Sequence, residues 1–187
     1  MEEMKEYIKN YEEVSLCSRE FDLIKVDKIK RSFNKPIVYI SVGRSIDLKE
    51  EMDVSNLDYD FIVTKGVNLK GNNVYYLGKE TSNTQDYIIA SDYIITKAGW
   101  GTISEALLAK KKIVVLERNN VSEDRNTISR LKNMNLAIEV SYNTDFDLEK
   151  TLNKLKNFKP RYNKYKLTNS YKEVAIKIIN KLINVGD

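Results

Sequence analysis

From Pro36 onward, short apolar runs alternate with stretches whose apolar residues recur at helical spacing. Apolar runs bounded by turn-forming residues are typical of buried strands, and they predict strands at 36–43, 60–66, 73–78, 92–97, 112–117 and 137–141. Helical spacing predicts helices at 84–91, 102–111, 122–135 and 145–157, the third stopped by Asn135 in a left-handed conformation. The alternation predicts a Rossmann-like α/β fold, a parallel sheet with helices on both faces.

Both ends of the chain and one internal segment have a different pattern. Residues 1–33 mix charged and scattered apolar residues, which predicts a helix, an extended linker and a short helix. We expect the Rossmann-like domain to span 34–160, with a short or irregular crossover helix between Gly43 and Asp60. Residues 161–187 contain a final helix that opens on a capping box, Ser170 with Glu173.

One face of this final helix is apolar along its length. The residues that share the face are Tyr171, Val174, Ile178, Leu182 and Val185. We expect a C-terminal docking helix, because terminal helices usually pack on their own domain. A partner-binding helix is the alternative.

Composition excludes several classes of protein. The 187 residues include 42% hydrophobic and 31% charged residues, enough apolar material for a core and too mixed in charge for disorder. A net charge of +4 is too mild for a nucleic-acid partner, which usually needs a clustered basic face. No apolar run approaches the roughly 20 residues of a membrane span, so we expect no direct membrane span.

The chain contains one cysteine and no histidine. A single cysteine excludes an internal disulfide and favours a reducing, cytoplasmic location, as does the charged N-terminal stretch without the pattern of a secretory signal. The lack of histidine removes the commonest general base and the commonest metal ligand. We therefore expect no zinc site and no Ser-His or Cys-His catalysis.

The most informative motif is the stretch KAGWGTISEAL, which joins the predicted strand at 92–97 to the helix after it. Glycine permits a positive φ and a close approach of the backbone to a ligand, and Gly99 and Gly101 stand two residues apart. Unpaired N–H groups at a helix start favour an anion such as phosphate, with Thr102 as the predicted N-cap. The alternative is a tight turn followed by a capping box, Thr102 with Glu105.

The segment from Asp92 to Val140 resembles the C-terminal domain of the family 28 glycosyltransferases. These are GT-B enzymes, and they include the peptidoglycan N-acetylglucosaminyltransferase that acts on lipid I. The resemblance covers about residues 15–157. It rests on Gly99, Thr102, Glu105, Leu131 and Ala137.

The resemblance implies a role for each matching residue. The donor diphosphate would lie against Gly43, Ser45, Ala98, Gly99, Trp100, Gly101 and Thr102. Glu105 would accept hydrogen bonds from the ribose hydroxyls, because a carboxylate offers two acceptors to a vicinal diol. The uracil base would meet Leu77 and Gly78, the donor sugar Glu123, Asp124 and Asn126, and the linker arginine of the family corresponds to Arg19.

Several residues of the donor region allow more than one interpretation. Arg44 stands where the family has a second glycine, and either adds a cation for a phosphate or blocks the close approach of the backbone. Trp100 either stacks on a base or an acceptor, or covers the loop. Glu123, Asp124 and Asn126 have a solvated helix start as their alternative.

As a whole, the resemblance implies the donor-binding half of a UDP-sugar-dependent glycosyltransferase. It would need no metal and no cofactor, and the catalytic base would lie outside this chain, in a missing N-terminal acceptor domain or a partner subunit. Residues 1–33 would be the interdomain linker and the tail of that domain. The alternatives are a subunit of a split enzyme at the inner membrane face, a UDP-sugar hydrolase or epimerase, and a nucleotide-binding module without catalysis.

Overall fold

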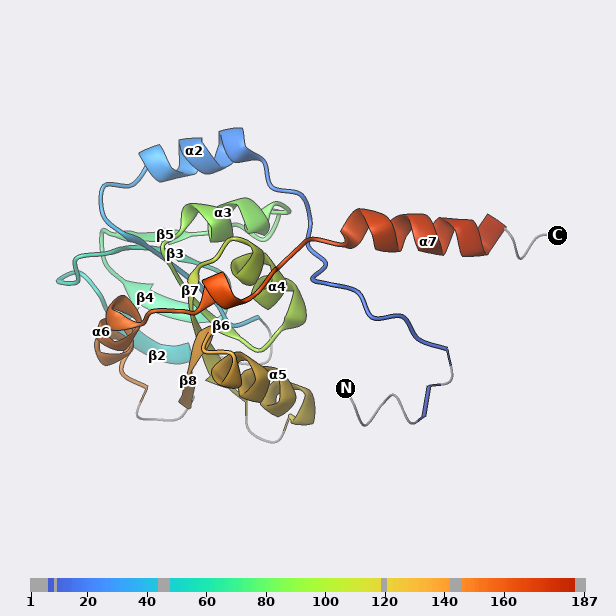
Figure 1. Ribbon diagram of the computed structural model, residues 1–187. Helices are drawn as coiled ribbons and strands as arrows, with labels where there is room; N and C mark the ends of the chain where they lie inside the picture. The colour runs from blue at the N-terminus through green and yellow to red at the C-terminus, as the bar shows by residue number, and fades with distance from the viewer. Residues whose placement is uncertain (1–6, 9, 44–47, 119–120, 142–145, 184–187) are drawn as a thin grey trace.

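The computed structural model describes residues 7–8, 10–43, 48–118, 121–141 and 146–183 (Figure 1). Its centre is a six-stranded, entirely parallel sheet in the order β5-β3-β1-β6-β7-β8. The strands are β1 (Ile37–Ser41), β3 (Asp60–Val63), β5 (Val74–Tyr76), β6 (Tyr93–Lys97), β7 (Lys112–Glu117) and β8 (Ala137–Ser141). All six predicted strands are confirmed, with ends that differ by a few residues at most.

Both faces of the sheet are buried, as a parallel sheet requires. Successive residues of β1 enter different apolar clusters, Tyr39 on one face and Ile40 on the other. The first face is covered by three helices, α3 (Thr84–Ala90), α4 (Trp100–Leu108) and α5 (Ser122–Asn133). The second face is covered by α6 (Leu148–Asn157) and by a small separate sheet (Figure 1).

That small sheet shows that the crossover helix expected between Gly43 and Asp60 was a wrong prediction. The segment forms β2 (Leu48–Asp53), which pairs in parallel with β4 (Val67–Lys70). Its backbone finds partners in β4, since Leu48 N–H donates to Gly66 O at 2.9 Å and Val54 N–H donates to Lys70 O at 2.9 Å. Leu48 and Val54 enter the core, so a strand buries this segment where a helix was expected.

The predicted stop of α5 is confirmed. Asn135 has a φ of 53°, in the left-handed region, and its N–H donates to Lys132 O at 2.8 Å. Asparagine tolerates this conformation better than other residues with a Cβ. The turn directs the chain from α5 into β8.

The N-terminal part of the chain is an extended linker followed by α2 (Leu23–Arg31), which packs on α3. The short helix expected before residue 33 is confirmed as α2. The first helix expected in 1–33 falls largely on residues 1–6 and 9, outside the described residues. The linker is tied to the C-terminal part by a parallel bridge between Leu16 and Asn169.

The final helix exists but does not dock. A short 3-10 helix, η1 (Tyr162–Lys164), packs on the domain, and α7 (Tyr171–Ile183) then projects away from it beside the N-terminal segment (Figure 1). None of the described residues of α7 is buried, which overturns the expected docking helix. Salt bridges instead join α7 to the linker, Lys172 to Glu20 at 2.8 Å and Lys177 to Glu12 at 3.0 Å.

Candidate functional site

The carboxyl ends of β1 and β6 lie side by side, because the two strands pair in parallel from Val38 with Tyr93 to Ser41 with Thr96. Gly43, just after β1, has a φ of 65°, a conformation that favours glycine. The side chain of Lys97, at the end of β6, lies against it: a Cβ added to Gly43 would stand 3.0 Å from Lys97 Cε and 3.1 Å from Nζ. A cation therefore stands between the two loops at this edge of the sheet.

The helix after β6 begins earlier than predicted. Its N-cap is Gly99 and its first residue is Trp100, so Thr102 lies inside the first turn. The capping box of Thr102 with Glu105 is therefore wrong. So is the expected positive φ at this glycine pair, because Gly99 is extended, with a φ of −73°, and Gly101 is helical.

The start of α4 presents N–H groups to the carboxyl edge of the sheet. Ala98 is buried in the core, and the Gly99 N–H donates to Lys97 O at 2.8 Å. The N–H groups of Trp100, Gly101 and Thr102 belong to the first turn of α4, so they have no acceptors within the helix. Trp100 is 53% exposed, as expected, although it belongs to the helix and not to a loop. A Cβ added to Gly101 would meet nothing within 4 Å, so the helix start faces open space.

A pocket of about 500 Å³ lies beside this helix start. Its lining comes from the linker, from α4 and from the first residue of α7: Cys17, Ser18, Arg19, Gly101, Thr102, Glu105 and Tyr171. The Glu105 side chain is only 6% exposed and belongs to this lining. A carboxylate one turn behind unpaired N–H groups offers an acceptor next to a site for an anion.

In this structure Arg19 is the partner of Glu105. Arg19 Nε and Nη2 donate to Glu105 Oε1 at 3.1 and 3.0 Å. The same guanidinium donates to Ser82 O at 2.5 Å and to Thr84 Oγ1 at 2.9 Å. Arg19 thus joins the linker to α4 and to the start of α3, and a ligand that binds Glu105 shares it with Arg19 or displaces Arg19.

Burial raises the pKa of the Glu105 carboxyl above its ordinary value of 4.5, Arg19 opposes this shift, and Asp86 adds to it. A charged carboxylate accepts stronger hydrogen bonds from hydroxyls than a neutral acid does. We therefore expect the affinity for a ribonucleotide to fall as the pH drops through the raised pKa of Glu105, beginning above 4.5.

Titration of UDP into the protein at a series of pH values measures this effect. The Glu105→Gln variant is the control, because it retains the shape of the side chain but cannot titrate. Protonation of the UDP phosphates affects both proteins equally, so it cancels in the ratio of the two affinities at each pH. A ratio that does not change with pH would contradict a direct role of the carboxylate.

Solved structures with a similar fold include glycosyltransferases. The glycosyltransferase SnogD from Streptomyces nogalater matches with a TM-score of 0.50 and 17% identity over 76% of this chain and 44% of its own. UGT89C1 of Arabidopsis thaliana, complexed with UDP, matches with a TM-score of 0.52 and 16% identity over 74% of this chain and 38% of its own. The glycosyltransferase VinC in complex with dTDP matches with a TM-score of 0.52 and 14% identity over 70% of this chain and 36% of its own.

The chain has the fold of one half of a GT-B glycosyltransferase. It spans less than half the length of each of these structures. No family model matches the sequence, and no curated protein matches it.

Within this GT-B half, Asp124 makes a contact that the predicted role does not include. It is completely buried, and both of its oxygens accept from Arg118, Oδ2 from Nε at 2.5 Å and Oδ1 from Nη2 at 2.5 Å. Asp124 therefore fixes the guanidinium of Arg118, just beyond β7, and both of its oxygens take part in this contact. Glu123 and Asn126 are exposed in the first turns of α5.

The remaining predicted residues lie around the same edge of the GT-B half. Leu77, the first residue after β5, is partly buried against the core, and Gly78 follows it. The Glu80 carboxylate lies where a Cβ of Gly78 would stand. Gly78 O accepts from Thr81 N–H at 3.1 Å in the loop that leads to Arg19's partner Ser82. Ser45 and Arg44 lie outside the described residues.

Sequence reasoning missed Lys97 and three residues of the pocket lining, Cys17, Ser18 and Tyr171. Lys97 ends an apolar run, and a polar residue at a strand's carboxyl end was the available signal. For Tyr171 no local signal existed, because it reaches the pocket through the contact between the linker and the C-terminal segment.

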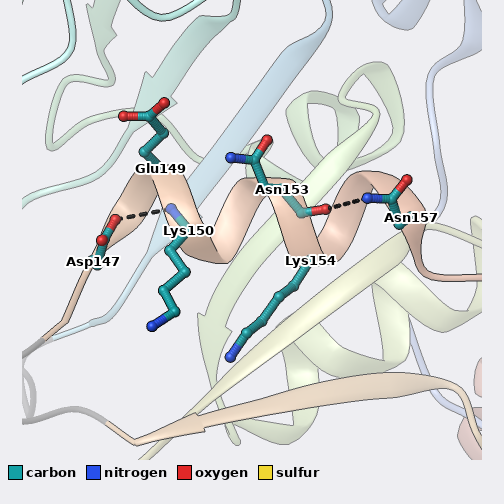
Figure 2. Close-up of a pocket in the computed structure, with 6 residues that line it drawn as sticks. All are labelled: Asp147, Glu149, Lys150, Asn153, Lys154 and Asn157. Carbon is teal, nitrogen blue, oxygen red and sulfur yellow. Dashed lines mark hydrogen bonds between the residues drawn. The ribbon is translucent and has the colours of Figure 1, made fainter.

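A larger hollow of about 590 Å³ lies on the outer side of α6 (Figure 2). Its lining belongs to α6 and its N-cap alone, and the hydrogen bonds drawn there stay within that segment, Lys150 N–H to Asp147 Oδ1 at 2.8 Å and Asn157 Nδ2 to Asn153 O at 3.0 Å. These contacts cap and extend the helix. They give this surface no feature of a site.

The described parts of the chain contain no group of three or more acidic or cysteine side chains placed to hold a metal ion. Within the same residues, every helix is too short or too polar to cross a lipid bilayer.

Proposed function

We propose that this chain is the donor-nucleotide-binding half of a UDP-sugar-dependent glycosyltransferase of the family 28 type. The observation that carries the proposal is the open start of α4, followed one turn later by Glu105 in a pocket at the carboxyl edge of a GT-B half. In open parallel sheets, ligands bind outside the carboxyl ends of the strands. The similar structures of UGT89C1 and VinC, which hold UDP and dTDP, support the same ligand class.

Each part of the site has a role in this proposal. The N–H groups of Trp100, Gly101 and Thr102, with the Lys97 ammonium, bind the diphosphate. Glu105 accepts from the ribose hydroxyls, and Leu77 and Gly78 border the base. Charge that develops on the departing diphosphate is stabilised by these donors, which are fixed before the reaction begins and need no metal.

The donor sugar lies toward the start of α5 in this account. Glu123 and Asn126 are exposed there, and Arg118, held by Asp124, interacts electrostatically with Glu123. Polar groups of this kind hydrogen-bond sugar hydroxyls, which suits hexosyl or N-acetylglucosaminyl transfer. The acceptor hydroxyl attacks the anomeric carbon, the bond from this carbon to the diphosphate oxygen breaks, and UDP leaves. The base that takes up the hydroxyl proton belongs to an acceptor domain or partner subunit outside this chain. The chain alone is inactive in transfer.

A second candidate is the binding subunit of a split glycosyltransferase, cytoplasmic and peripheral at the inner membrane face through its partner. The apolar residues of α7 favour it, because they are exposed: Ile176, Ile178, Ile179, Leu182 and Ile183. Exposed apolar clusters of this kind often mark an interface. The nucleotide site is the same in both candidates, and a UDP-sugar-binding module without transfer also shares it.

Calorimetric titration tests the nucleotide site. We expect UDP to bind in a one-to-one complex, with uridine weaker by at least about tenfold, because charge-assisted hydrogen bonds contribute roughly 1.5–3 kcal/mol each. UDP-N-acetylglucosamine then reports on the donor sugar. Equal affinity for UDP and uridine, or no binding of either at millimolar concentration, would contradict the proposal.

A further inference from the structure

The pocket beside Glu105 is completed by a residue from the far end of the sequence. Two of its sides come from the linker at residues 17–19 and from α4, and the remaining lining residue is Tyr171, the first residue of α7. Tyr171 is half-buried, whereas most of α7 is exposed. The C-terminal arm, defined as residues 169–183, therefore touches the site through Tyr171.

A network of hydrogen bonds fixes this end of the arm to the linker. Asn169 holds Ser18 by both backbone groups, with Oδ1 accepting from Ser18 N at 3.1 Å and Nδ2 donating to Ser18 O at 3.0 Å. Asn169 Oδ1 also accepts from Tyr171 N at 3.3 Å, and Ser170 N donates to Leu16 O at 2.8 Å. These bonds set the place of Tyr171 at the rim of the pocket.

The side chain of Tyr171 is held as well. Its hydroxyl is hydrogen-bonded to Glu20, and Lys172 Nζ lies 5.6 Å from the centre of its ring and 2.8 Å from Glu20 Oε1. The other polar or charged side chains of the lining are Ser18, Arg19, Thr102 and Glu105. Tyr171 supplies the one large aromatic surface in a lining that is otherwise small or charged.

We propose that Tyr171 is a nucleoside-contacting residue, whose ring packs against the nucleotide that Glu105 holds by its ribose. This inference rests on the proposed function and adds a specificity-determining residue to it. Nucleosides present flat apolar faces, and aromatic side chains are the usual platforms for them. The nucleotide then touches the linker, α4 and the C-terminal arm together, so binding holds the arm in place.

Titration of UDP into Tyr171 variants of the full chain tests this inference. We expect Tyr171→Ala to weaken UDP binding by about tenfold, as expected for the loss of one aromatic contact with a nucleoside. Tyr171→Phe, which retains the ring, is expected to stay within about threefold of the unmodified chain. Ile176→Ala is the matched control on the same helix, since Ile176 is 57% exposed and outside the pocket, and we expect no change.

Cys17 provides an independent measurement, because it is the only cysteine of the chain and lines the same pocket. We expect saturating UDP to slow the alkylation of Cys17 by iodoacetamide severalfold, followed by intact mass. Unchanged alkylation would place the nucleotide outside this pocket and overturn the inference, whether or not the Tyr171→Ala variant folds.

The outcomes separate this inference from the proposed function. UDP binding to Tyr171→Ala as tight as to the unmodified chain would overturn the role of Tyr171 and leave the proposed function intact. No UDP binding to the unmodified chain would overturn both. Equal weakening by Tyr171→Phe and Tyr171→Ala would assign the effect to the hydroxyl bond with Glu20 and would overturn the ring contact.

Discussion

Replacement of Arg118 by alanine is expected to lower the free energy of unfolding by about 3–5 kcal/mol, the usual effect of removing one partner of a buried ion pair. Asp124 is completely buried, and Arg118 donates to both of its oxygens. Without Arg118 the buried carboxylate loses its compensating charge and the donors to both of its oxygens. Urea unfolding followed by circular dichroism measures the change.

Two further variants make this prediction specific. Arg130→Ala removes an exposed arginine from α5, the helix that carries Asp124, and we expect a change within about 0.5 kcal/mol. The double variant Arg118→Ala/Asp124→Ala removes both charges, and it is expected to recover part of the lost stability. An Arg118→Ala protein as stable as the unmodified chain would show that Asp124 does not depend on this pair.

The second large effect concerns ligand binding. We expect Glu105→Ala to weaken UDP binding by roughly 10- to 100-fold, because a hydrogen bond to a charged group contributes about 1.5–3 kcal/mol. The fold should tolerate this change. Arg19, the present partner of Glu105, is 49% exposed and keeps Ser82 O and Thr84 Oγ1 as acceptors, so the change leaves no buried charge without a partner.

Calorimetric titration and thermal unfolding of the same samples decide the role of Glu105. The control is Glu149→Ala, which removes an exposed carboxylate from α6, and its UDP affinity should equal that of the unmodified chain. Unchanged UDP binding together with a large loss of stability would make Glu105 an anchor for Arg19 and not a ligand-binding residue.

Most of the sheet could be predicted from the sequence, because strands buried on both faces are short continuous apolar runs. The strand at 137–141 was predicted with the ends that the structure gives. The segment that contains β2 was harder, since Lys49, Glu50 and Glu51 obscure its alternation and its partner β4 lies beyond another strand. A pairing of that kind depends on tertiary structure and leaves no local pattern.

The start of α4 shows how a local rule misled the prediction. Gly101 has a low helix propensity, and the GWG stretch is typical of a turn, so the helix was placed two residues too late. The structure starts the helix at Trp100, because Gly99 adopts the extended conformation of an N-cap. The positive φ expected at Gly99 or Gly101 is found instead at Gly43, which follows the neighbouring strand β1.

The sequence predicted individual site residues but not the contacts between them. Arg19 and Glu105 were each expected near the donor, yet their direct contact spans 86 residues of sequence and depends on the path of the linker. The apolar face of α7 correctly predicted a helix but not its environment, because amphipathic spacing does not identify what covers a face. The domain boundaries at 33 and 160 remain a prediction.

A structure of the protein with UDP bound would show directly whether the start of α4 holds the nucleotide. We expect the diphosphate within hydrogen-bonding distance of the N–H groups of Trp100, Gly101 and Thr102, and the ribose hydroxyls on Glu105, with Arg19 shifted or sharing the carboxylate. A nucleotide bound elsewhere, with Arg19 still on Glu105 and the start of α4 facing solvent, would contradict it.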